Sequence, residues 1–388
     1  MAISTSDLLK VPYFAPVMVV AGAKGLDKPV NGAGILDYEY DRDYIMNEQV
    51  FLKDSLLVSS LLFAKDDPDA LIGALRELIP LGVTGLAYKT AIFEDLPAEV
   101  LELADRHNFP ILKFGMELFV EEFIFNVMEN IRLEHQIVEK EKLLDDLIEG
   151  RTPKTELHRV AKQINPYLDR YVYTAYFDQR EKMDFPFFET VHRGPTGIKR
   201  IDDGTTVCRY QNGFFILISD HHSDEKRYAA RLEDIMAYLA PKKNSCRVGK
   251  GQMNRCPEEL ALCFQQAWYA SLCARVTGAP AVDYAEMGLY QILVPHARSP
   301  HLMCFAGQFL APILEDTSET AQDLFKTAVA YVLSEGDITK TAERAYCHKN
   351  TVRYRMNKLH ERLAPGSRED TFFEQLSSAV RIHLLNNL

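Results

Sequence analysis

The feature that most constrains the fold is residues 116–149, a stretch in which no Gly or Pro occurs. Gly150 and Pro153 follow it, so we expect one long α-helix with a stop signal at its end. The chain has 388 residues, which exceeds the roughly 250–300 that one hydrophobic core usually serves. We therefore expect this helix to separate domains. The predicted segments are 1–115, 116–150, 151–316 and 317–388.

Apolar residues repeat within this helix at alternating intervals of four and three, which is the spacing of coiled coils. The apolar rungs are Leu133, Ile137, Leu144 and Leu147, while the middle rung is Lys140. Charged residues flank this ladder. The pattern predicts a helix that pairs with a copy of itself in a homodimer. A helix that packs on its own domain with one solvated face explains the pattern equally well, so both interpretations stay open.

The N-terminal segment alternates short apolar runs with helical patterns. Asp67-Pro68 predicts the start of one helix, and Pro97 predicts the start of the next. The strand candidates are residues 16–21, 55–61, 83–88 and 111–114. Alternation at this spacing favours a mostly parallel sheet with helices on its faces, so we expect an α/β domain of a sensor-like kind.

The middle segment reads as a second α/β domain. Gln211-Asn212-Gly213 predicts the turn of a β-hairpin over residues 206–219, because it tolerates a positive φ. Pro295 and Pro300 predict a loop around His296, His301 and Cys304. Further strands are expected at residues 171–177, 247–249 and 281–284, and helices at 224–239 and 257–276.

Composition narrows the class of protein. The residues are 47% hydrophobic and 26% charged, and the formal net charge is −11, so only a local basic patch could bind a polyanion. The seven cysteines form no CxxC pair, which is typical of reduced intracellular thiols. The N-terminal residues do not resemble a secretory signal, and no apolar run approaches the roughly 18 residues that span a bilayer. We expect a cytoplasmic protein without membrane contact.

The C-terminal segment predicts a helix-turn-helix. One amphipathic helix ends at Glu335-Gly336, and Asp337 then caps a second, short helix. After a turn at Tyr346-Cys347, a third helix carries an apolar stripe from Val352 to Leu363 and a polar, basic opposite face. Two short helices joined by a tight turn, the second basic on its outer face, are typical of DNA-binding proteins. An ordinary three-helix cap with a solvated charged face is the alternative.

Charge supports the first interpretation. Residues 336–363 carry seven Lys and Arg against three Asp and Glu, which is +4, and leave −15 for the rest of the chain. Because Asn pairs with adenine and Arg with guanine, Asn350 and Arg353 are the candidates for reading bases. The expected phosphate contacts are Lys340, Thr351, Tyr354 and Lys358.

Residues 348–356, HKNTVRYRM, resemble the recognition helix of the PucR-type bacterial transcription regulators, which reads His-Arg-Asn-Thr-aliphatic-x-Tyr-Arg-aliphatic. Thr341-Ala342 in the preceding helix matches as well, and a capping box at Thr371–Glu374 opens a trailing helix. The resemblance implies binding to double-stranded operator DNA. The full set of predicted contacts is Lys340, Thr341, His348, Lys349, Asn350, Thr351, Arg353, Tyr354, Arg355 and Lys358.

The N-terminal segment resembles the sensor domain of the same family. The matching residues are 19–22, 25–30, 103–105 and 109–112. The resemblance implies a small-molecule effector and control of purine or other nitrogen-compound catabolism. Asp54-Ser55 stands where the family commonly has Gly-Glu, so any role of that pair does not transfer.

The middle domain resembles a diguanylate cyclase that has lost its chemistry. Residues 209–216 lie where a cyclase carries Arg-Tyr-Gly-Gly-Asp/Glu-Glu-Phe, but Asn212, Gly213 and Phe214 supply no carboxylate to hold the metal ions. We therefore expect no enzyme activity and a role in dimerization or signal relay. A nucleotide-binding or cyclase-like signalling protein is the alternative function.

No residue pattern predicts a metal or a cofactor. Asp220-His221-His222 is expected to be a solvated loop, and Gly32-Ala33-Gly34 lacks the third glycine of a dinucleotide loop. Asp37, Glu39, Asp41 and Asp43 could line an effector pocket at a sheet edge, although a hydrated acidic loop is favoured.

Overall fold

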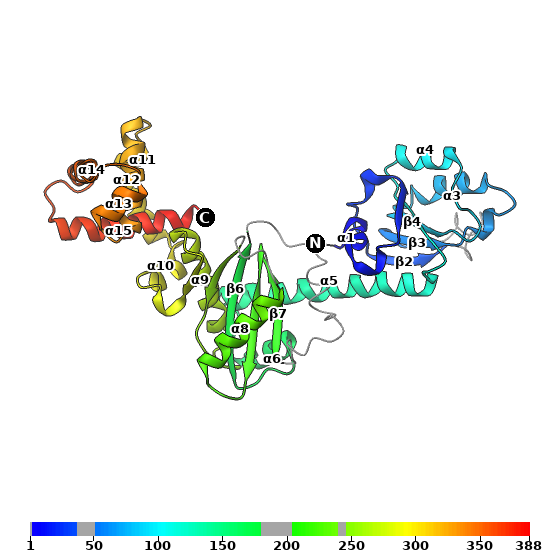
Figure 1. Cartoon of the computed structure of the whole chain (residues 1–388), viewed down its shortest axis with the longest axis horizontal. Coiled ribbons are helices and arrows are strands. Elements are labelled where there is room, and N and C mark those ends of the chain that lie inside the picture. Colours follow the sequence, from blue (N-terminus) through cyan, green and yellow to red (C-terminus); the bar gives the residue numbers. More distant parts are fainter. Residues whose placement is uncertain (1, 37–50, 180–203, 240–245) are drawn as a thin grey trace. The chain divides into compact units, whose positions relative to one another are not determined.

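The structure is a computed structural model, and it describes residues 2–36, 51–179, 204–239 and 246–388. The described residues form two compact units that divide between Leu143 and Leu144, inside the long helix α5 (Val120–Ile148). The fold class is confirmed, because an α/β sheet lies in each unit and the C-terminal part is all helical (Figure 1).

The first unit is built on a mostly parallel five-stranded sheet, as the alternation of strands and helices predicts. The strand order is β1-β5-β4-β3-β2, and only β1 runs antiparallel to its neighbour β5. The strands are β1 (Met18–Ala21), β2 (Gly32–Ile35), β3 (Ser55–Ser59), β4 (Gly85–Lys89) and β5 (Ile111–Phe114).

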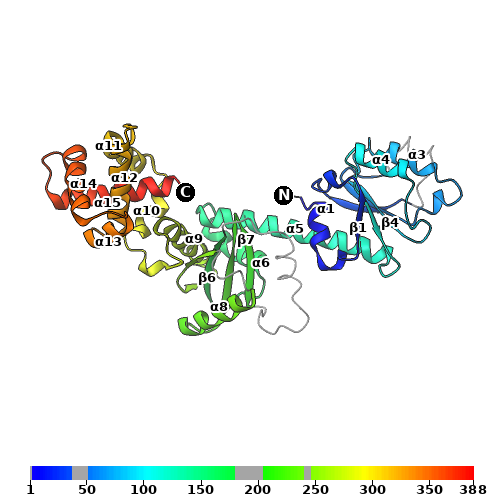
Figure 2. The same cartoon turned by 45° about the horizontal axis from the view of Figure 1, so that its top comes forward.

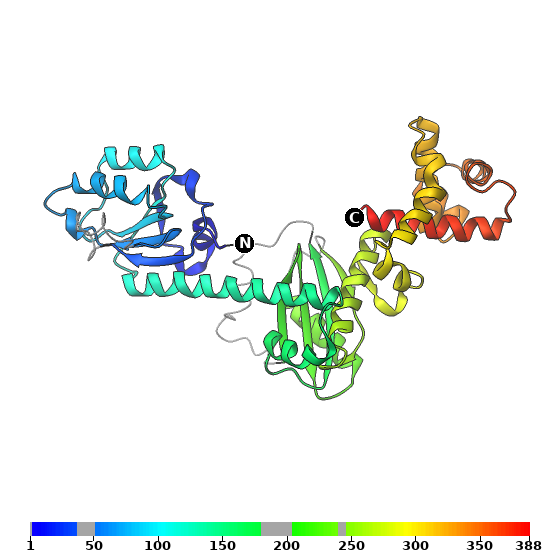
Figure 3. The same ribbon diagram turned by 180° about the vertical axis from the view of Figure 1, so that it is seen from behind.

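Helices cover both faces of this sheet (Figure 3). On one face α3 (Ala70–Leu78) and α4 (Ala98–Arg106) pack against Leu57 and Leu86. On the other face α1 (Thr5–Lys10) and the first half of α5 pack against Leu56, because successive strand residues point to opposite faces. Short 3-10 turns lie at η1 (Pro12–Phe14), η2 (Ala23–Gly25) and η3 (Leu62–Ala64).

The start of α3 differs from the prediction. Asp67 does not cap the helix; its carbonyl instead accepts a bond from Ala70 N, and the N-cap is Asp69, whose side chain makes no capping bond. A turn at residues 67–69 therefore moves the start of the helix two residues along the chain. The start of α4 directly after Pro97 is confirmed.

The second unit contains an antiparallel sheet in the order β11-β9-β6-β8-β7, with only β11 parallel to β9. The expected hairpin is present, and Gln211 supplies the positive φ of 49° in its turn. The strands are β6 (Tyr171–Gln179), β7 (Thr205–Tyr210), β8 (Gly213–Asp220), β9 (Cys246–Lys250), β10 (Asn254–Arg255) and β11 (Ala281–Asp283). The helices of this part are η4 (Lys154–Glu156), α6 (Leu157–Ile164), α8 (Glu225–Leu239), α9 (Leu260–Thr277) and η5 (Tyr284–Glu286).

Six helices follow the sheet and share one core (Figure 2). This core joins Ala306 and Leu310 to the predicted helix-turn-helix residues Val352 and Leu359, so its apolar contacts begin before residue 317. The helices are α10 (Tyr290–His296), α11 (Pro300–Leu314), α12 (Glu319–Leu333), α13 (Ile338–Arg344), α14 (Lys349–Leu363) and α15 (Glu369–Asn386).

Two predictions in this part are wrong. Pro295 and Pro300 lie in helices, not in a loop, because Pro300 occupies the first turn of α11, where its missing N–H costs nothing, and Pro295 is next to the last residue of α10. The capping box at Thr371 is also wrong, since α15 begins at Glu369. Two acidic residues in its first turn, Glu369 and Asp370, oppose the positive end of the helix dipole.

The apolar ladder of α5 is used inside the single chain. Leu133 and Ile137 pack in the core of the first unit, and Leu144 and Leu147 are buried in the second. Gln265 on α9 donates its side-chain amide to the carbonyls of Leu147 and Ile148, at 3.1 Å each, and so caps the end of α5. This agrees with the interpretation in which the helix packs on its own chain.

Candidate nucleic-acid interface

The start of α13 is fixed by Asp337, as its sequence position predicts. Its Oδ1 accepts bonds from the backbone N–H groups of Thr339 at 2.7 Å and Lys340 at 3.0 Å. These bonds hold the pKa of Asp337 below its ordinary value, because they favour the ionised carboxylate. Glu335 and Gly336 precede it with φ of 54° and 81°, which reverses the chain after α12.

The turn into α14 is equally well defined. Tyr346 has a φ of 51° and its side chain is 96% exposed. His348 is the N-cap of α14, and its ring Nδ1 accepts a bond of 3.2 Å from Asn350 N. Below the turn, the small Ala342 is buried, which lets α13 and α14 approach closely, and Val352 lies in the shared core.

One face of α14 carries the predicted DNA-reading side chains into solvent. Lys349, Asn350, Arg353 and Tyr354 are all exposed. Arg353 Nη1 donates to Asn350 Oδ1 at 3.3 Å, so the two predicted base-reading side chains meet on one face, one helical turn apart. The Lys358 ammonium lies 4.8 Å from the centre of the Tyr354 ring, which holds this half-buried side chain over the same face.

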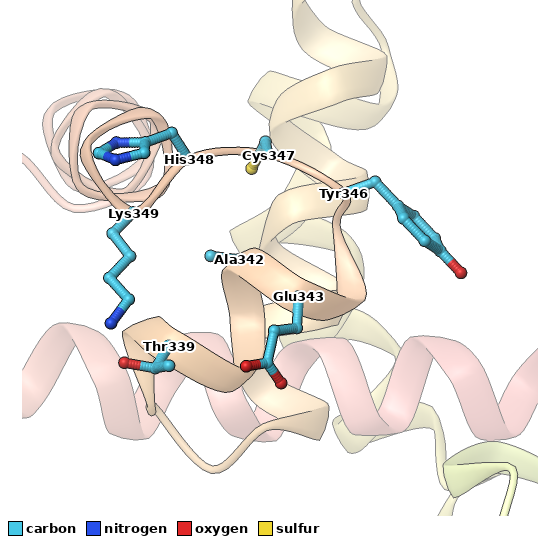
Figure 4. Close-up of a pocket in the computed structure, with 7 residues that line it drawn as sticks. All are labelled: Thr339, Ala342, Glu343, Tyr346, Cys347, His348 and Lys349. Carbon is cyan, nitrogen blue, oxygen red and sulfur yellow. The ribbon is translucent and has the colours of Figure 1, made fainter.

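An open hollow of about 650 Å³ lies between α13 and α14 (Figure 4). Lys349 and His348 border it at the start of α14, while Tyr346 points away from it (Figure 4). Thr339, Glu343 and Tyr346 also line it, and the prediction missed them. Their signal was position alone, because Thr339 lies in the first turn of α13, Glu343 in its last turn and Tyr346 in the turn that follows.

Two predicted contacts point inward. Thr341 is fully buried, and its hydroxyl donates 2.6 Å to the carbonyl of Asp337, so it belongs to the helix cap. Arg355 faces α12, where its guanidinium donates to Asp323 Oδ2 at 2.5 Å and to Thr327 Oγ1 at 3.2 Å. The structure therefore places both side chains away from the exposed face of α14. Of the remaining predicted contacts, Lys340 and His348 are exposed and Thr351 is half-buried.

The other candidate sites that the structure describes lie in a strand and in an exposed turn. Gly32-Ala33-Gly34 lies in strand β2, and His221 and His222 form an exposed turn beside Asp169 and Asp220. Within the described ranges, no three His, Cys, Asp or Glu side chains gather as metal ligands do. The acidic residues Asp37, Glu39, Asp41 and Asp43 lie outside the described residues.

The N-terminal segments that carry the family resemblance meet each other in the structure. Gly22 N donates 2.6 Å to Asp105 Oδ1, and Lys28 Nζ donates 2.7 Å to the carbonyl of Asn108. A Cβ on Gly22 would lie 1.9 Å from the Phe109 carbonyl oxygen, so only glycine fits. These residues hold β1 against the loop between α4 and β5.

Comparison with known proteins identifies the two ends of the chain. Residues 7–131 match the purine catabolism regulatory protein-like family, and residues 324–382 match the PucR C-terminal helix-turn-helix domain. Both ends are of the PucR type. The second match spans α13, the turn and α14, and so confirms the resemblance in the region that carries the exposed basic face.

Curated relatives agree with this assignment. The purine catabolism regulatory protein of Bacillus subtilis is 26% identical over 162 residues, which are 40% of this chain and 29% of that protein. The proline-responsive transcriptional activator PutR of the same species is 27% identical over 79 residues, 20% of this chain and 19% of that protein. The chain therefore matches less than a third of the length of these two relatives.

A solved regulator of polyketide synthase expression from Bifidobacterium adolescentis overlaps 64% of this chain and 98% of its own, at 12% identity and a TM-score of 0.30. Among the described helices, none combines the length and apolarity that crossing a membrane requires.

Proposed function

We propose that the chain is a sequence-specific, DNA-binding transcription regulator. The observation that carries the proposal is the exposed face of α14, where Lys349, Asn350, Arg353 and Tyr354 all reach solvent beside a well-capped turn. A helix with this face presented after a tight turn is the element that enters the major groove in helix-turn-helix proteins. The local charge of +4 on an otherwise acidic chain attracts phosphate to this surface.

The exposed side chains divide into two roles. Asn350 and Arg353 read base edges, exchanging their mutual hydrogen bond for bonds to adenine and guanine. Lys340, His348, Lys349, Thr351, Tyr354 and Lys358 contact the phosphate backbone and set the register of α14 in the groove. Thr341 and Arg355 take no part in DNA contact and shape the domain from within.

The wider role follows the family. The N-terminal domain binds a small-molecule effector, and the middle domain relays that state and does not catalyse a reaction. The regulated genes serve purine or other nitrogen-compound catabolism, in line with the names of the two Bacillus relatives. The protein acts in the cytoplasm as a homodimer or larger assembly, because one recognition helix buries little surface and two half-sites multiply modest affinities.

Fluorescence anisotropy with the promoter DNA beside the gene tests the proposal. We expect saturable binding that weakens steeply with salt, and a loss of about tenfold or more on Arg353→Ala, the size of a lost base contact. Arg76→Ala, on an exposed helix of the first unit, is the control and leaves affinity unchanged.

Reversing the charges of Lys349 and Arg353 separates this function from docking of a protein partner. Unchanged operator affinity in a folded double variant would contradict the proposal. A separate assay with GTP and Mg²⁺ examines the middle domain, where the β7–β8 turn offers no carboxylate at residues 212–214. Formation of a cyclic dinucleotide would overturn its assignment to signal relay.

A further inference from the structure

Helix α11 presents an outer face unlike the rest of this acidic chain. From Ser299 to Leu314 no Asp, Glu, Lys or Arg occurs, although the whole chain carries 99 such residues, 44 basic and 55 acidic. Met303 is 44% exposed and Leu314 40% exposed on this helix. Cys304, Gly307 and the polar residues His301 and Gln308 are exposed as well, so a strip that contains no Asp, Glu, Lys or Arg faces solvent.

The opposite side of α11 packs against the core of its own domain. Ala306, Leu310 and Ile313 are buried in the core that also holds α14 and α15. Figures 1 and 3 show α11 beside α12, rising from α15. The outer strip is therefore carried on a rigid element of the same core as the recognition helix.

The ends of the strip carry opposite charges. Arg298 precedes α11 and Glu315 follows it, both are exposed, and neither forms an ion pair within the described part of the chain. The midpoint between these two residues falls at Ala306 and Gly307. A Cβ added to Gly307 would meet nothing within 4 Å, so the space over the centre of the strip is open.

We propose that the outer face of α11 binds the same face of a second copy, with the two helices antiparallel and crossing at Gly307. In a two-fold interface of this kind, each contact occurs twice: if one residue of the first copy meets another residue of the second copy, the reverse contact forms as well. The crossing places Met303 of each copy opposite the small Ala311 of the other. It also brings Arg298, which lies just before α11, near Glu315, which follows the far end of the partner helix. This inference rests on the proposed function, since it supplies the dimer that two DNA half-sites require.

Electrostatics favours a second copy as the occupant. Two chains of net charge −11 repel each other over most of their surfaces, and an uncharged strip is the place where that repulsion is weakest. Opposite charges at the two ends fix an antiparallel orientation and exclude the parallel one, in which like charges would meet. The glycine at the crossing permits helix axes at the close end of the usual 8–10 Å.

The expected affinity is modest. A single pair of 15-residue helices is small beside the roughly 1,200 Å² at the lower bound of stable interfaces. We therefore expect a dissociation constant in the micromolar range for the free protein, and much tighter pairing on DNA that carries two half-sites. Sedimentation velocity of the full chain over a range of concentrations measures the first quantity.

Single changes test the face. Met303→Glu buries two carboxylates in the contact, and Gly307→Leu fills the crossing point while improving helix propensity. Each is expected to raise the dissociation constant at least tenfold without lowering the thermal midpoint. Ile292→Glu, at a site on α10 that is 64% exposed, is the matched control and leaves association unchanged.

Charge exchange and cross-linking test the register. Arg298→Glu alone is expected to weaken association severalfold, and adding Glu315→Arg is expected to restore it. In a Cys304→Ser background, Gly307→Cys is expected to form a covalent dimer under mild oxidation, whereas Ile292→Cys in the same background does not.

Some results would overturn the inference. One is a wild-type chain that stays monomeric at about 200 µM. The other is a dissociation constant that neither Met303→Glu nor Gly307→Leu changes. Binding to a single half-site separates this failure from failure of the proposed function. A chain that binds one half-site but does not pair through α11 keeps its DNA-binding role and loses only the proposed interface.

Discussion

The middle sheet and the helix-turn-helix use their charged residues in opposite ways. In the sheet, Asp178 is only 4% exposed and is held by both arms of the Arg275 guanidinium, at 2.6 and 2.7 Å. In the helix-turn-helix, Lys349 and Arg353 reach out into solvent. The difference teaches that a charge paired internally stabilises the fold, while a charge left in solvent is available to a partner.

Arg275→Ala should produce the largest effect on stability. It leaves the buried carboxylate of Asp178 without its partner, which costs about 3 kcal/mol in the free energy of unfolding. Chemical denaturation measures this loss, and operator affinity of the remaining folded protein should not change. Arg159→Ala is the control, because its exposed pair with Glu156 contributes about 0.5 kcal/mol or less. Equal losses in the two variants would break the comparison between buried and exposed charge.

Arg355 sharpens the comparison, because it is a charged residue of the helix-turn-helix that faces inward. We expect Arg355→Ala to lower stability by about 1 kcal/mol, since its bonds to Asp323 and Thr327 are partly exposed. Operator affinity should fall about threefold to tenfold as α14 loosens against α12. The slope of affinity against salt should stay the same, because no phosphate contact is removed. A slope smaller by about one unit would instead place Arg355 on the DNA.

Lys349→Ala is the outward-facing counterpart. We expect the slope of log affinity against log salt to shrink by about 0.9, the value for one lost phosphate contact, with stability unchanged. Affinity at about 0.1 M salt should fall by a few-fold. Lys162→Ala, an exposed lysine on α6, should alter neither quantity. An unchanged slope for Lys349→Ala would remove this residue from the interface.

The Asp337 cap should produce the smallest effect. Its pKa is lowered by bonds from the backbone N–H groups of Lys340 and Thr339, so the cap stabilises the ionised form. That stabilisation is fully present above the ordinary aspartate pKa of about 4 and is lost as the pH falls through the lower folded value. Asp337→Asn keeps a capping oxygen and should lose this part of the acid sensitivity. Thermal melts between about pH 2 and 6 compare the two chains, and identical pH profiles would contradict the assignment.

Much of the fold was predictable because its signals are local. The run of strands and helices in both α/β parts follows from periodicity, and the cap at Asp337 follows from one residue in front of a helix. The wrong predictions also concern local signals read without their context. A proline can end a helix, but it can also occupy the first turn of one, as Pro300 does in α11.

The candidate site was predictable as a set of residues but not as a set of directions. Charge and helical spacing in the sequence select α14 and most of its side chains. Helical spacing separates Arg353 from Arg355, because residues two positions apart point about 200° apart on a helix. The family resemblance nevertheless added Arg355 to the predicted contacts, and the structure pairs it with Asp323 on α12.

The sequence by itself determined where helices and strands form, how α13 is capped and which helix carries the basic residues, because these depend on neighbours within a few positions. Tertiary structure decided that the ladder of α5 is buried in its own chain, that Thr341 and Arg355 serve the interior, and that the uncharged side of α11 is left in solvent. Those outcomes depend on which distant segment packs against each face, and no local pattern records that.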